Sequence, residues 1–319
     1  MKRIGVLTSG GDAPGMNAAI RAVTRTALNK GMEVVGIRRG YNGLINGDVF
    51  DMNVRSVSSI IQRGGTLLFT ARCPEFKTEE GLQKAVNACH EMNIEGLVVI
   101  GGDGSYRGAG DLSARGIPCI GLPGTIDNDI SSTDYTIGYD TAMNTVVQMV
   151  DKLRDTAHSH DRCSVVEVMG RRAGYIALNT AVACGATEVL CPERDYNLDD
   201  VVAKMQRTRQ TGKQNFIIVV AEGIGNSNEI AKFIEEKTGI ESRATILGHV
   251  QRGGSPTVRD RVLASQMGYY AVNLLEQGIG NRVIGVRGNK FVDYDIHEAL
   301  QMVKPFEDDL YDISGIISI

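Results

Sequence analysis

Several features that would assign this chain to a special class are missing from its sequence. The six cysteines include no C-x-x-C pair, and in a chain this long scattered cysteines are typical of reduced thiols in a cytosolic protein. No apolar run reaches the length of a membrane-spanning helix. The first run, Ile4 to Thr8, is broken at Gly10-Gly11-Asp12, which makes it too short for a signal peptide. We therefore expect a soluble, cytoplasmic protein.

An excess of positive charge is missing as well. The 34 lysines and arginines are outnumbered by 38 aspartates and glutamates, which gives a net charge of -4. This argues against the broad basic face that nucleic-acid binding requires, so any anion site must be built from local clusters of arginine. The apolar share of 42% and the charged share of 23% are ordinary for a globular protein. A length of 319 residues predicts about two domains.

Glycine is abundant, with 38 residues, and many glycines stand where strands should end. Two short apolar runs, within residues 98–105 and 119–129, each end in a turn of glycine and carboxylate. Because ligands bind outside the carboxyl ends of strands in an open α/β sheet, Asp103, Asp127 and Asp129 should lie together on one rim beside bare backbone amides. That combination suits a magnesium-bound nucleotide phosphate. Ordinary turns are the alternative, but two such turns in succession favour a site.

Another glycine loop follows the first strand. The order of strand Ile4–Thr8, loop Ser9–Gly15 and a helix over residues 16–29 directs backbone N–H groups and a helix N-terminus at phosphate. No Lys-Ser or Lys-Thr pair closes the loop, so it is not a P-loop of the Walker type, and alone it indicates phosphate only weakly. Arg21 and Arg25 are four residues apart and share one face of this helix.

Strands alternate with helices up to residue 129, which predicts a parallel, doubly wound sheet. After a helix expected over residues 137–156, a second alternation begins and predicts a second α/β domain. The linkers are tight, so we expect a defined cleft between the domains, where ligand sites are common. Strands and loops of the second half again end in polar turns: Met169-Gly170-Arg171, Ala221-Glu222-Gly223 and Leu247 to Gly254.

Phosphoryl transfer requires alignment, neutralisation of charge on the moving group, and a base for the proton of the acceptor. From the residues alone, Asp127 and Asp129 are both candidate bases, and Asp103 is a candidate magnesium ligand. Arginine binds phosphate in a bidentate manner, and Arg171 and Arg252 gain weight from their glycine-flanked turns. Further candidates for binding a phosphate or sugar are Arg72, Arg162, Arg243 and, unless its ring is hydrogen-bonded within its own turn, His249.

Eight segments carry a resemblance to a known family: Leu7–Asp12, Pro14–Asn17, Thr70–Phe76, Gly101–Ser105, Pro123–Asp129, Met169–Arg171, Ala221–Gly223 and Gly248–Pro256. Together they resemble the bacterial ATP-dependent 6-phosphofructokinase family, and the resemblance covers essentially the whole chain. The combination is highly specific. The Gly-Gly-Asp-Gly turn by itself is not, because NAD kinases and diacylglycerol kinases carry a similar one.

The resemblance implies transfer of the γ-phosphate of ATP to the 1-hydroxyl of fructose 6-phosphate in glycolysis. It implies that Asp127 takes the hydroxyl proton, that Arg171 stabilises the transition state, and that Thr125 lies beside the transferring group. Asp129 belongs to the same catalytic set, and Asp103 is the carboxylate associated with Mg2+. The implied ATP-binding residues are Gly11, Tyr41, Arg72, Cys73, Gly102, Asp103, Gly104 and Ser105. The implied substrate-binding residues are Thr125, Ile126, Asp127, Arg162, Met169, Gly170, Arg171, Glu222, Arg243, His249, Val250, Gln251 and Arg252.

The resemblance also implies a domain layout and an assembly. We expect two doubly wound, Rossmann-like, three-layer α/β/α domains with the active site in the cleft between them. The ATP-binding domain would comprise residues 1–138 and about 256–304, and the fructose 6-phosphate-binding domain residues 139–255 and about 305–319. The family forms homotetramers with shared active sites, in which Arg162 and Arg243 reach in from a neighbouring subunit. Neither nucleic acid nor a membrane is an expected partner.

Two glycines indicate the phosphoryl donor. Pyrophosphate-dependent relatives carry an acidic residue at the position of Gly104 and a lysine at that of Gly124. A carboxylate at position 104 would obstruct and repel the α-phosphate of a nucleotide. Glycine at both positions therefore favours ATP over pyrophosphate.

The family's second nucleotide site takes ADP as activator and phosphoenolpyruvate as inhibitor. Thr187 stands where the family has a glutamate that meets the magnesium of the activator or the phosphate of the inhibitor. Glu188 is adjacent, but successive residues of a strand face opposite sides. We therefore expect a weakened effector response with the active site intact. The residues that match this site are Arg21, Arg25, Arg154, Gly185 and Lys213, whereas Thr211, Gln214 and Asn215 stand where the family is more basic.

Two other functions stay open on the sequence alone. An NAD kinase shares the Gly-Gly-Asp-Gly turn, but it does not account for the paired Asp127 and Asp129 or for the turn from His249 to Arg252. A non-catalytic, nucleotide-sensing subunit would have lost the base or the transition-state cation. This chain keeps both Asp127 and Arg171.

Overall fold

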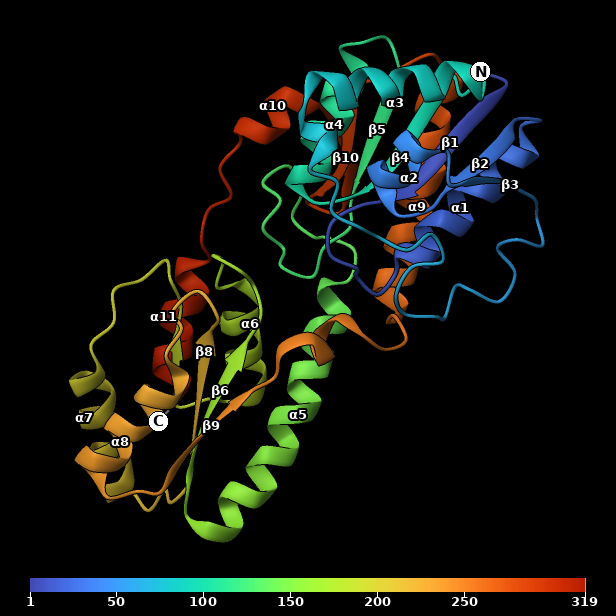
Figure 1. Ribbon diagram of the computed structural model, residues 1–319. Coiled ribbons are helices and arrows are strands. Elements are labelled where there is room, and N and C mark those ends of the chain that lie inside the picture. Colours follow the sequence, from blue (N-terminus) through green and yellow to red (C-terminus); the bar gives the residue numbers. More distant parts are fainter. Residues whose placement is uncertain (319) are drawn as a thin grey trace. The chain divides into compact units, whose positions relative to one another are not determined.

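The computed structural model describes residues 1–318, and the chain forms two compact units (Figure 1). Each unit is discontinuous in sequence, because the chain passes several times from one to the other. Unit 1 comprises Met1–Ile126, Ile130–Thr141 and Arg252–Lys304, and unit 2 comprises Asp127–Asp129, Ala142–Gln251 and Pro305–Ile319. Each unit is built on its own sheet.

The sheet of unit 1 has seven strands in the order β11-β10-β5-β4-β1-β2-β3. Its five inner strands run parallel. The central strands are short apolar runs with both faces covered, which is typical of parallel sheets; every residue of β4 and β5 is buried. The strands are β1 (Arg3–Thr8), β2 (Glu33–Ile37), β3 (Val49–Met52), β4 (Gly96–Gly101), β5 (Cys119–Pro123), β10 (Arg282–Arg287) and β11 (Lys290–Asp295).

The predicted parallel, doubly wound sheet is confirmed in the five inner strands, and the two edge strands are antiparallel. β3 pairs antiparallel with β2, and β11 pairs antiparallel with β10. At the second edge the reason is local: Arg287 pairs with Lys290, so only Gly288 and Asn289 join the strands. Both have positive φ, 53° and 64°, as a tight two-residue hairpin requires. A parallel neighbour would need a crossover of a dozen residues or more.

Helices cover both faces of this sheet (Figure 1). One face carries α1 (Met16–Asn29) and α9 (Val258–Glu276), which pack along each other. The opposite face carries one apolar cluster, which joins strand residues such as Leu7 and Val99 to helix residues such as Leu82 and Tyr106. The helices and the 3-10 turn on that side are α2 (Gly40–Asn46), η1 (Glu75–Lys77), α3 (Glu79–Glu91), α4 (Asp103–Ser113) and α10 (Ile296–Gln301).

Unit 2 contains a four-stranded parallel sheet in the order β7-β8-β6-β9. The strands are β6 (Cys163–Val168), β7 (Glu188–Leu190), β8 (Phe216–Ala221) and β9 (Ser242–Ile246). Helices α7 (Leu198–Gln210) and α8 (Ser227–Thr238) bury an apolar cluster on one face. Helices α6 (Tyr175–Cys184) and α11 (Asp308–Ile317) pack together against β7 and β8. The 3-10 turn η2 (Gly248–Arg252) follows β9.

The helix expected over residues 137–156 begins at Tyr139 and runs to His160 as α5. Its first three residues belong to unit 1 and the remainder to unit 2. No helix among the described residues is long and apolar enough to cross a membrane.

Two buried tyrosines in the apolar cluster of unit 1 give a matched stability test. The Tyr41 hydroxyl donates to the Ser105 carbonyl at 2.5 Å, whereas the Tyr106 hydroxyl has no hydrogen-bond partner among residues 1–318. Losing a buried hydrogen bond costs about 1 kcal/mol, and an unsatisfied buried polar group is itself unfavourable. Tyr41→Phe should therefore lower the free energy of unfolding by about 1 kcal/mol, while Tyr106→Phe should leave it unchanged or raise it. Urea unfolding measures both, and equal losses would contradict this assignment.

Candidate active site

The carboxyl ends of β1, β4 and β5 lie side by side, because these strands are adjacent and parallel. Hydrogen bonds join the ends of these strands directly. The Ser9 amide donates to the Ile100 carbonyl at 3.0 Å, and the Gly124 amide donates to the Gly101 carbonyl at 3.0 Å. The topology therefore brings the glycine loop Ser9–Gly15, the turn at Asp103 and Thr125 to one edge of the sheet, where α/β folds bind ligands.

Two helices begin at this edge without a side-chain cap. Gly15 is the N-cap of α1 and Gly102 the N-cap of α4, and neither residue has a side chain to cap the first turn. Such N-terminal amides, together with the positive end of the helix dipole, bind phosphate. The glycine turn at the start of α4 is thus a candidate phosphate-binding site, whereas the first turn of α1 is buried.

Arg252 lies directly against the glycine loop of unit 1. Its Nη1 donates to the Asp12 carbonyl at 3.0 Å, and a Cβ at Gly11 would come within 2.4 Å of that Nη1. Glycine at position 11 therefore makes room for the guanidinium. A residue expected to bind sugar phosphate here supplies positive charge beside the loop expected to bind ATP.

In unit 2, Asp127 and Arg171 form an ion pair with a distance of 3.1 Å between Oδ2 and Nε. The Asp127 side chain has no solvent exposure, whereas that of Arg171 is 60% exposed. The guanidinium stabilises the ionised form of the carboxylate, which is the form that accepts a proton. The two residues that the sequence selected as base and cation are therefore direct partners.

The backbone that presents Arg171 is unusual. Arg171 has φ 56° and follows Gly170 at φ 145°, and a non-glycine residue in the left-handed region stores strain that often marks a functional site. Glu222 holds this conformation, because its Oε1 accepts hydrogen bonds from the Gly170 amide, at 3.2 Å, and from the Arg171 amide. Glu222 thus shapes the turn, a role that its position in the sequence did not reveal.

Gln251 also builds a turn, the one that carries His249. Its Oε1 accepts from the Met169 amide at 3.1 Å and its Nε2 donates to the Gly248 carbonyl at 2.9 Å. Gln251 has no solvent exposure, while His249 and Val250 are exposed. The side chain of Gln251 therefore acts on the backbone, and the exposed residues of the turn face solvent in this structure.

A glutamate that sequence reasoning missed joins two of the candidate phosphate ligands. Glu241 accepts from Arg162 Nε at 2.7 Å and from Arg243 Nη2 at 2.7 Å. The pKa of Glu241 is lowered, mainly because Arg162 and Arg243 donate hydrogen bonds to its carboxylate. Glu241 lies outside every recognised motif, so only the fold could show that it gathers the two arginines.

Known proteins resemble this chain over its whole length. Residues 3–275 match the sequence profile of the family described as Phosphofructokinase. The chain belongs to the phosphofructokinase family. It is 59% identical over 318 residues to the ATP-dependent 6-phosphofructokinase of Clostridium botulinum strain Hall and 56% identical over 319 residues to that of Bacillus subtilis strain 168, with 100% of both chains covered each time. The structure of phosphofructokinase from Saccharomyces cerevisiae matches with a TM-score of 0.90 at 35% identity, covering 100% of this chain and 48% of that chain.

The resemblance to phosphofructokinases is thus confirmed, but two of the side chains that it implied at the site lie in the interior. Tyr41 is 5% exposed and stacks on Phe76 with ring centroids 4.0 Å apart. The Tyr41 hydroxyl donates a hydrogen bond to the Ser105 carbonyl, so Tyr41 supports α4 from the core. Ile126 is fully buried. Cys73 packs against the same cluster as Tyr41, and Arg72 is exposed.

The two glycines used to infer the phosphoryl donor differ in their surroundings. A Cβ at Gly104 would meet nothing within 4 Å, so a carboxylate fits there sterically and would act through its charge and reach. A Cβ at Gly124 would lie 2.9 Å from Ile100 Cγ2 and 3.0 Å from Met16 Cε. A side chain at position 124 would therefore crowd two core residues of this chain, whereas one at position 104 would not.

Asp103 belongs to unit 1, whereas Asp127 and Asp129 belong to unit 2. No group of three or more histidine, cysteine or carboxylate side chains able to hold a metal occurs within residues 1–318. Mg2+ that arrives with a nucleotide needs only one or two protein carboxylates, because phosphate oxygens and water supply the rest. Asp103, half-buried in the first turn of α4 beside uncovered amides, fits such a role.

The residues that match the effector site of phosphofructokinases lie on both units. In unit 1, the pKa of Arg21 is lowered by burial and by Arg25. In unit 2, Lys213 donates to the Ser318 carbonyl at 3.1 Å, and burial and Arg154 lower its pKa. Arg154 itself donates to the carbonyl of Cys184, next to Gly185. A cavity of about 490 Å³ is lined by Arg154, Asp155, His158, Ser159 and Asn215.

Thr187 differs from the glutamate of the family in more than charge. It is 1% exposed, and its hydroxyl has no hydrogen-bond partner among the described residues. Glu188 is paired with Lys204 at 3.0 Å. The carboxylate adjacent to position 187 is therefore already engaged with a cation of this chain.

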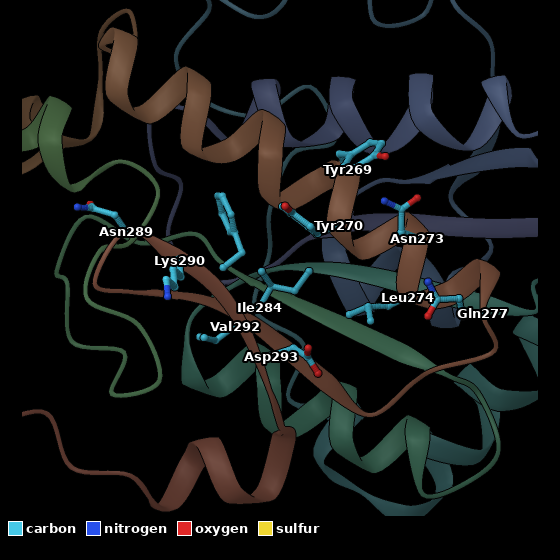
Figure 2. Close-up of a pocket in the computed structure, with 11 residues that line it drawn as sticks. Tyr269, Tyr270, Asn273, Leu274, Gln277, Ile284, Asn289, Lys290, Val292 and Asp293 are labelled. Atoms are coloured by element: carbon cyan, nitrogen blue, oxygen red, sulfur yellow. The ribbon is translucent and has the colours of Figure 1, made fainter.

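A second cavity, of about 610 Å³, lies between α9 and the β10–β11 hairpin (Figure 2). No residue predicted for the site lines it. Its aromatic side chains pack on one another: Tyr270 lies 4.8 Å from Phe291 between ring centroids, and Tyr269 meets Tyr270 edge-on at 5.7 Å. They leave no slot between parallel rings for a planar ligand, and Asp293 is paired with Arg282.

Proposed function

We propose that this protein transfers the γ-phosphate of ATP to the 1-hydroxyl of fructose 6-phosphate, giving fructose 1,6-bisphosphate and ADP. The observation that carries the proposal is the ion pair between buried Asp127 and Arg171, a base and a cation joined in one site. Full-length relatives at 56–59% identity bear the name of this activity. The protein acts in glycolysis, in the cytoplasm.

In the proposed mechanism Asp127 accepts the proton of the 1-hydroxyl as that oxygen attacks the γ-phosphorus in line. Arg171 then turns from the carboxylate to the charge that develops on the moving phosphoryl group, which guanidinium stabilises by bidentate hydrogen bonding. Thr125 lies beside the transferring group and Asp129 supports the same site. The exposure of Arg171 leaves its guanidinium room to change partners.

ATP is bound by residues of unit 1. The N-terminus of α4 receives a phosphate, and Arg252 adds positive charge beside the glycine loop. Mg2+, when bound with ATP, neutralises charge on the β- and γ-phosphates, and Asp103 would hold it directly or through water. The proposed ATP-binding residues are Gly11, Arg72, Cys73, Gly102, Asp103, Gly104 and Ser105. Tyr41 contributes indirectly, by its hydrogen bond to the Ser105 carbonyl.

Fructose 6-phosphate is bound mainly by residues of unit 2. Arg162 and Arg243, joined by Glu241, supply guanidinium groups for its phosphate, and in the homotetramer that we propose they serve a neighbouring subunit. The remaining proposed contacts are Thr125, Ile126 through its backbone, Met169, Gly170, Glu222, His249, Val250, Gln251 and Arg252.

A coupled assay of ADP release tests this function. ADP should form only when fructose 6-phosphate is present, and Asp127→Ala should lower kcat by about 10²- to 10⁴-fold, the usual worth of a general base. Asp195→Ala, which alters an exposed aspartate of the same unit, is the matched control and should keep the wild-type rate. Equal rates for wild type and Asp127→Ala would end the base assignment. Turnover with pyrophosphate that equals turnover with ATP would refute the donor.

We further expect a weak response to effectors, because Thr187 offers no carboxylate and Glu188 is engaged with Lys204. ADP and phosphoenolpyruvate are titrated at sub-saturating fructose 6-phosphate. Each should change the half-saturating concentration of fructose 6-phosphate by less than about 5-fold, the lower end of typical allosteric coupling. A strong sigmoidal shift with either ligand would refute this expectation and leave the proposed reaction untouched.

A further inference from the structure

A buried carboxylate in unit 1 lies outside the eight segments that carry the resemblance. Asp260, in the first turn of α9, has no solvent exposure. Its Oδ1 accepts from the Gly138 amide at 2.9 Å, and its Oδ2 accepts from the Thr141 amide at 2.8 Å and the Thr141 hydroxyl at 2.5 Å. Three donors thus converge on one side chain. An ionised carboxylate can accept all of them, whereas an amide offers only one oxygen.

The hydrogen bonds of Asp260 close into a network at the start of two helices. The Thr141 hydroxyl, which donates to Asp260, accepts from the Thr257 amide at 3.0 Å. The Thr257 hydroxyl caps α9 by accepting from the Asp260 amide at 3.3 Å. All of these residues lie in unit 1, so the first turn of α5 is bound to the first turn of α9.

This network adjoins the two loops that the proposed reaction uses. Gly15 has φ 106° and Gly138 has φ 104°. A Cβ at Gly15 would lie 2.7 Å from Ile137 Cγ2 and 3.5 Å from Asp260 Cβ, and a Cβ at Gly138 would lie 2.7 Å from Ala13 Cβ. Glycines at both positions let the loop Ser9–Gly15 and the end of the segment 124–138 approach closely, with Asp260 at the same point.

The segment 124–138 transmits this anchor to Thr125. The Thr125 amide donates to the Ile137 carbonyl at 3.2 Å, and the Ile137 amide donates to the Pro123 carbonyl at 2.8 Å. Ile137 directly precedes Gly138, whose amide is held by Asp260. Two steps of main-chain hydrogen bonding therefore connect Asp260 to the residues that lead into Asp127.

A buried carboxylate at position 260 has a desolvation cost that stability alone does not explain. Burial raises the pKa of Asp260, and the hydrogen bonds from Thr141 and Gly138 oppose that shift. Facing charge comes from Asp140, which also raises the pKa, while the N-terminus of α5 favours an anion. Apolar packing avoids the desolvation of a buried charge. The carboxylate instead fixes the geometry of one short segment, because it accepts three hydrogen bonds from Gly138 and Thr141.

We propose that Asp260 is a positioning residue for phosphoryl transfer, which holds the segment 124–138 against the glycine loop so that Thr125 and the chain leading into Asp127 keep their productive placement. This inference rests on the proposed function. Asp260 itself touches neither substrate, and it acts through Gly138 and Thr141. Misplacing reacting groups by about 1 Å costs up to roughly 10²-fold in rate, so the effect belongs in kcat.

The test compares Asp260→Asn, Thr141→Val and Thr141→Ser in steady-state kinetics with ATP and fructose 6-phosphate. Asp260→Asn should lower kcat about 10- to 100-fold with both KM values changed less than about threefold. Thr141→Val removes one donor without changing the size of the side chain, and it should lower kcat by a smaller factor. Thr141→Ser keeps the hydroxyl and should retain the wild-type rate.

Unchanged kcat in both Asp260→Asn and Thr141→Val would overturn the inference, as would a loss of thermal stability with normal kinetics. Should Asp260→Asn fail to fold, the contrast between Thr141→Val and Thr141→Ser decides, and equal kcat in these two overturns it. A wild-type enzyme without turnover would instead overturn the proposed function itself. The two failures are therefore distinguishable.

Discussion

A carboxylate removed from solvent has to be paired, and this constraint organises the proposed site. Asp127 has no exposure, and Arg171 reaches it at 3.1 Å while remaining largely in solvent. Arg171 makes this pair from a turn with a left-handed backbone, and Glu222 binds the amides of that turn. A buried charge, a strained turn and a second carboxylate are thus linked by direct contacts. In the proposed mechanism it is the exposed partner, Arg171, that moves.

In unit 1, main-chain hydrogen bonds and glycines, rather than paired charged side chains, hold the loops at the edge of the sheet. Its strands end at one edge, and the loops beyond them are tied by amide-to-carbonyl bonds. Glycine at positions 15 and 138 allows close approach. The few charges present act on the backbone: Arg252 binds the Asp12 carbonyl, and Asp260 binds the amides of Gly138 and Thr141. Main-chain contacts of this kind would hold the proposed phosphate-binding loops in place before a ligand binds, which favours electrostatic preorganisation.

Much of this could be predicted from the sequence where local pattern and burial agree. The helix over residues 16–29 has the expected bounds, because turn residues bound its apolar pattern. The hairpin to β11 was missed, since its strand is half-exposed and reads as polar. The antiparallel edge at β3 was missed for the same reason.

The candidate site shows the same limit. Motifs identified Asp127 and Arg171, yet no motif shows that a guanidinium 44 positions further along the chain, at about 3 Å, is the partner of a carboxylate. Glu241 and Asp260 lie outside the recognised turns, and their roles come from residues brought together only by the fold. Tyr41 was expected at the nucleotide, but its ring completes the core. Sequence patterns thus supplied the candidate residues, and the contacts between them needed the structure.

The central claim is that Asp127 and Arg171 act as one unit in the chemical step. The most direct measurement is a double-mutant cycle on the single-turnover rate with ATP and fructose 6-phosphate, using Asp127→Asn, Arg171→Lys and the combined variant. Groups that act as a unit are strongly non-additive, so the combined variant should be about as slow as the slower single variant. Losses that multiply in the combined variant would show that the two residues act independently and would contradict the account.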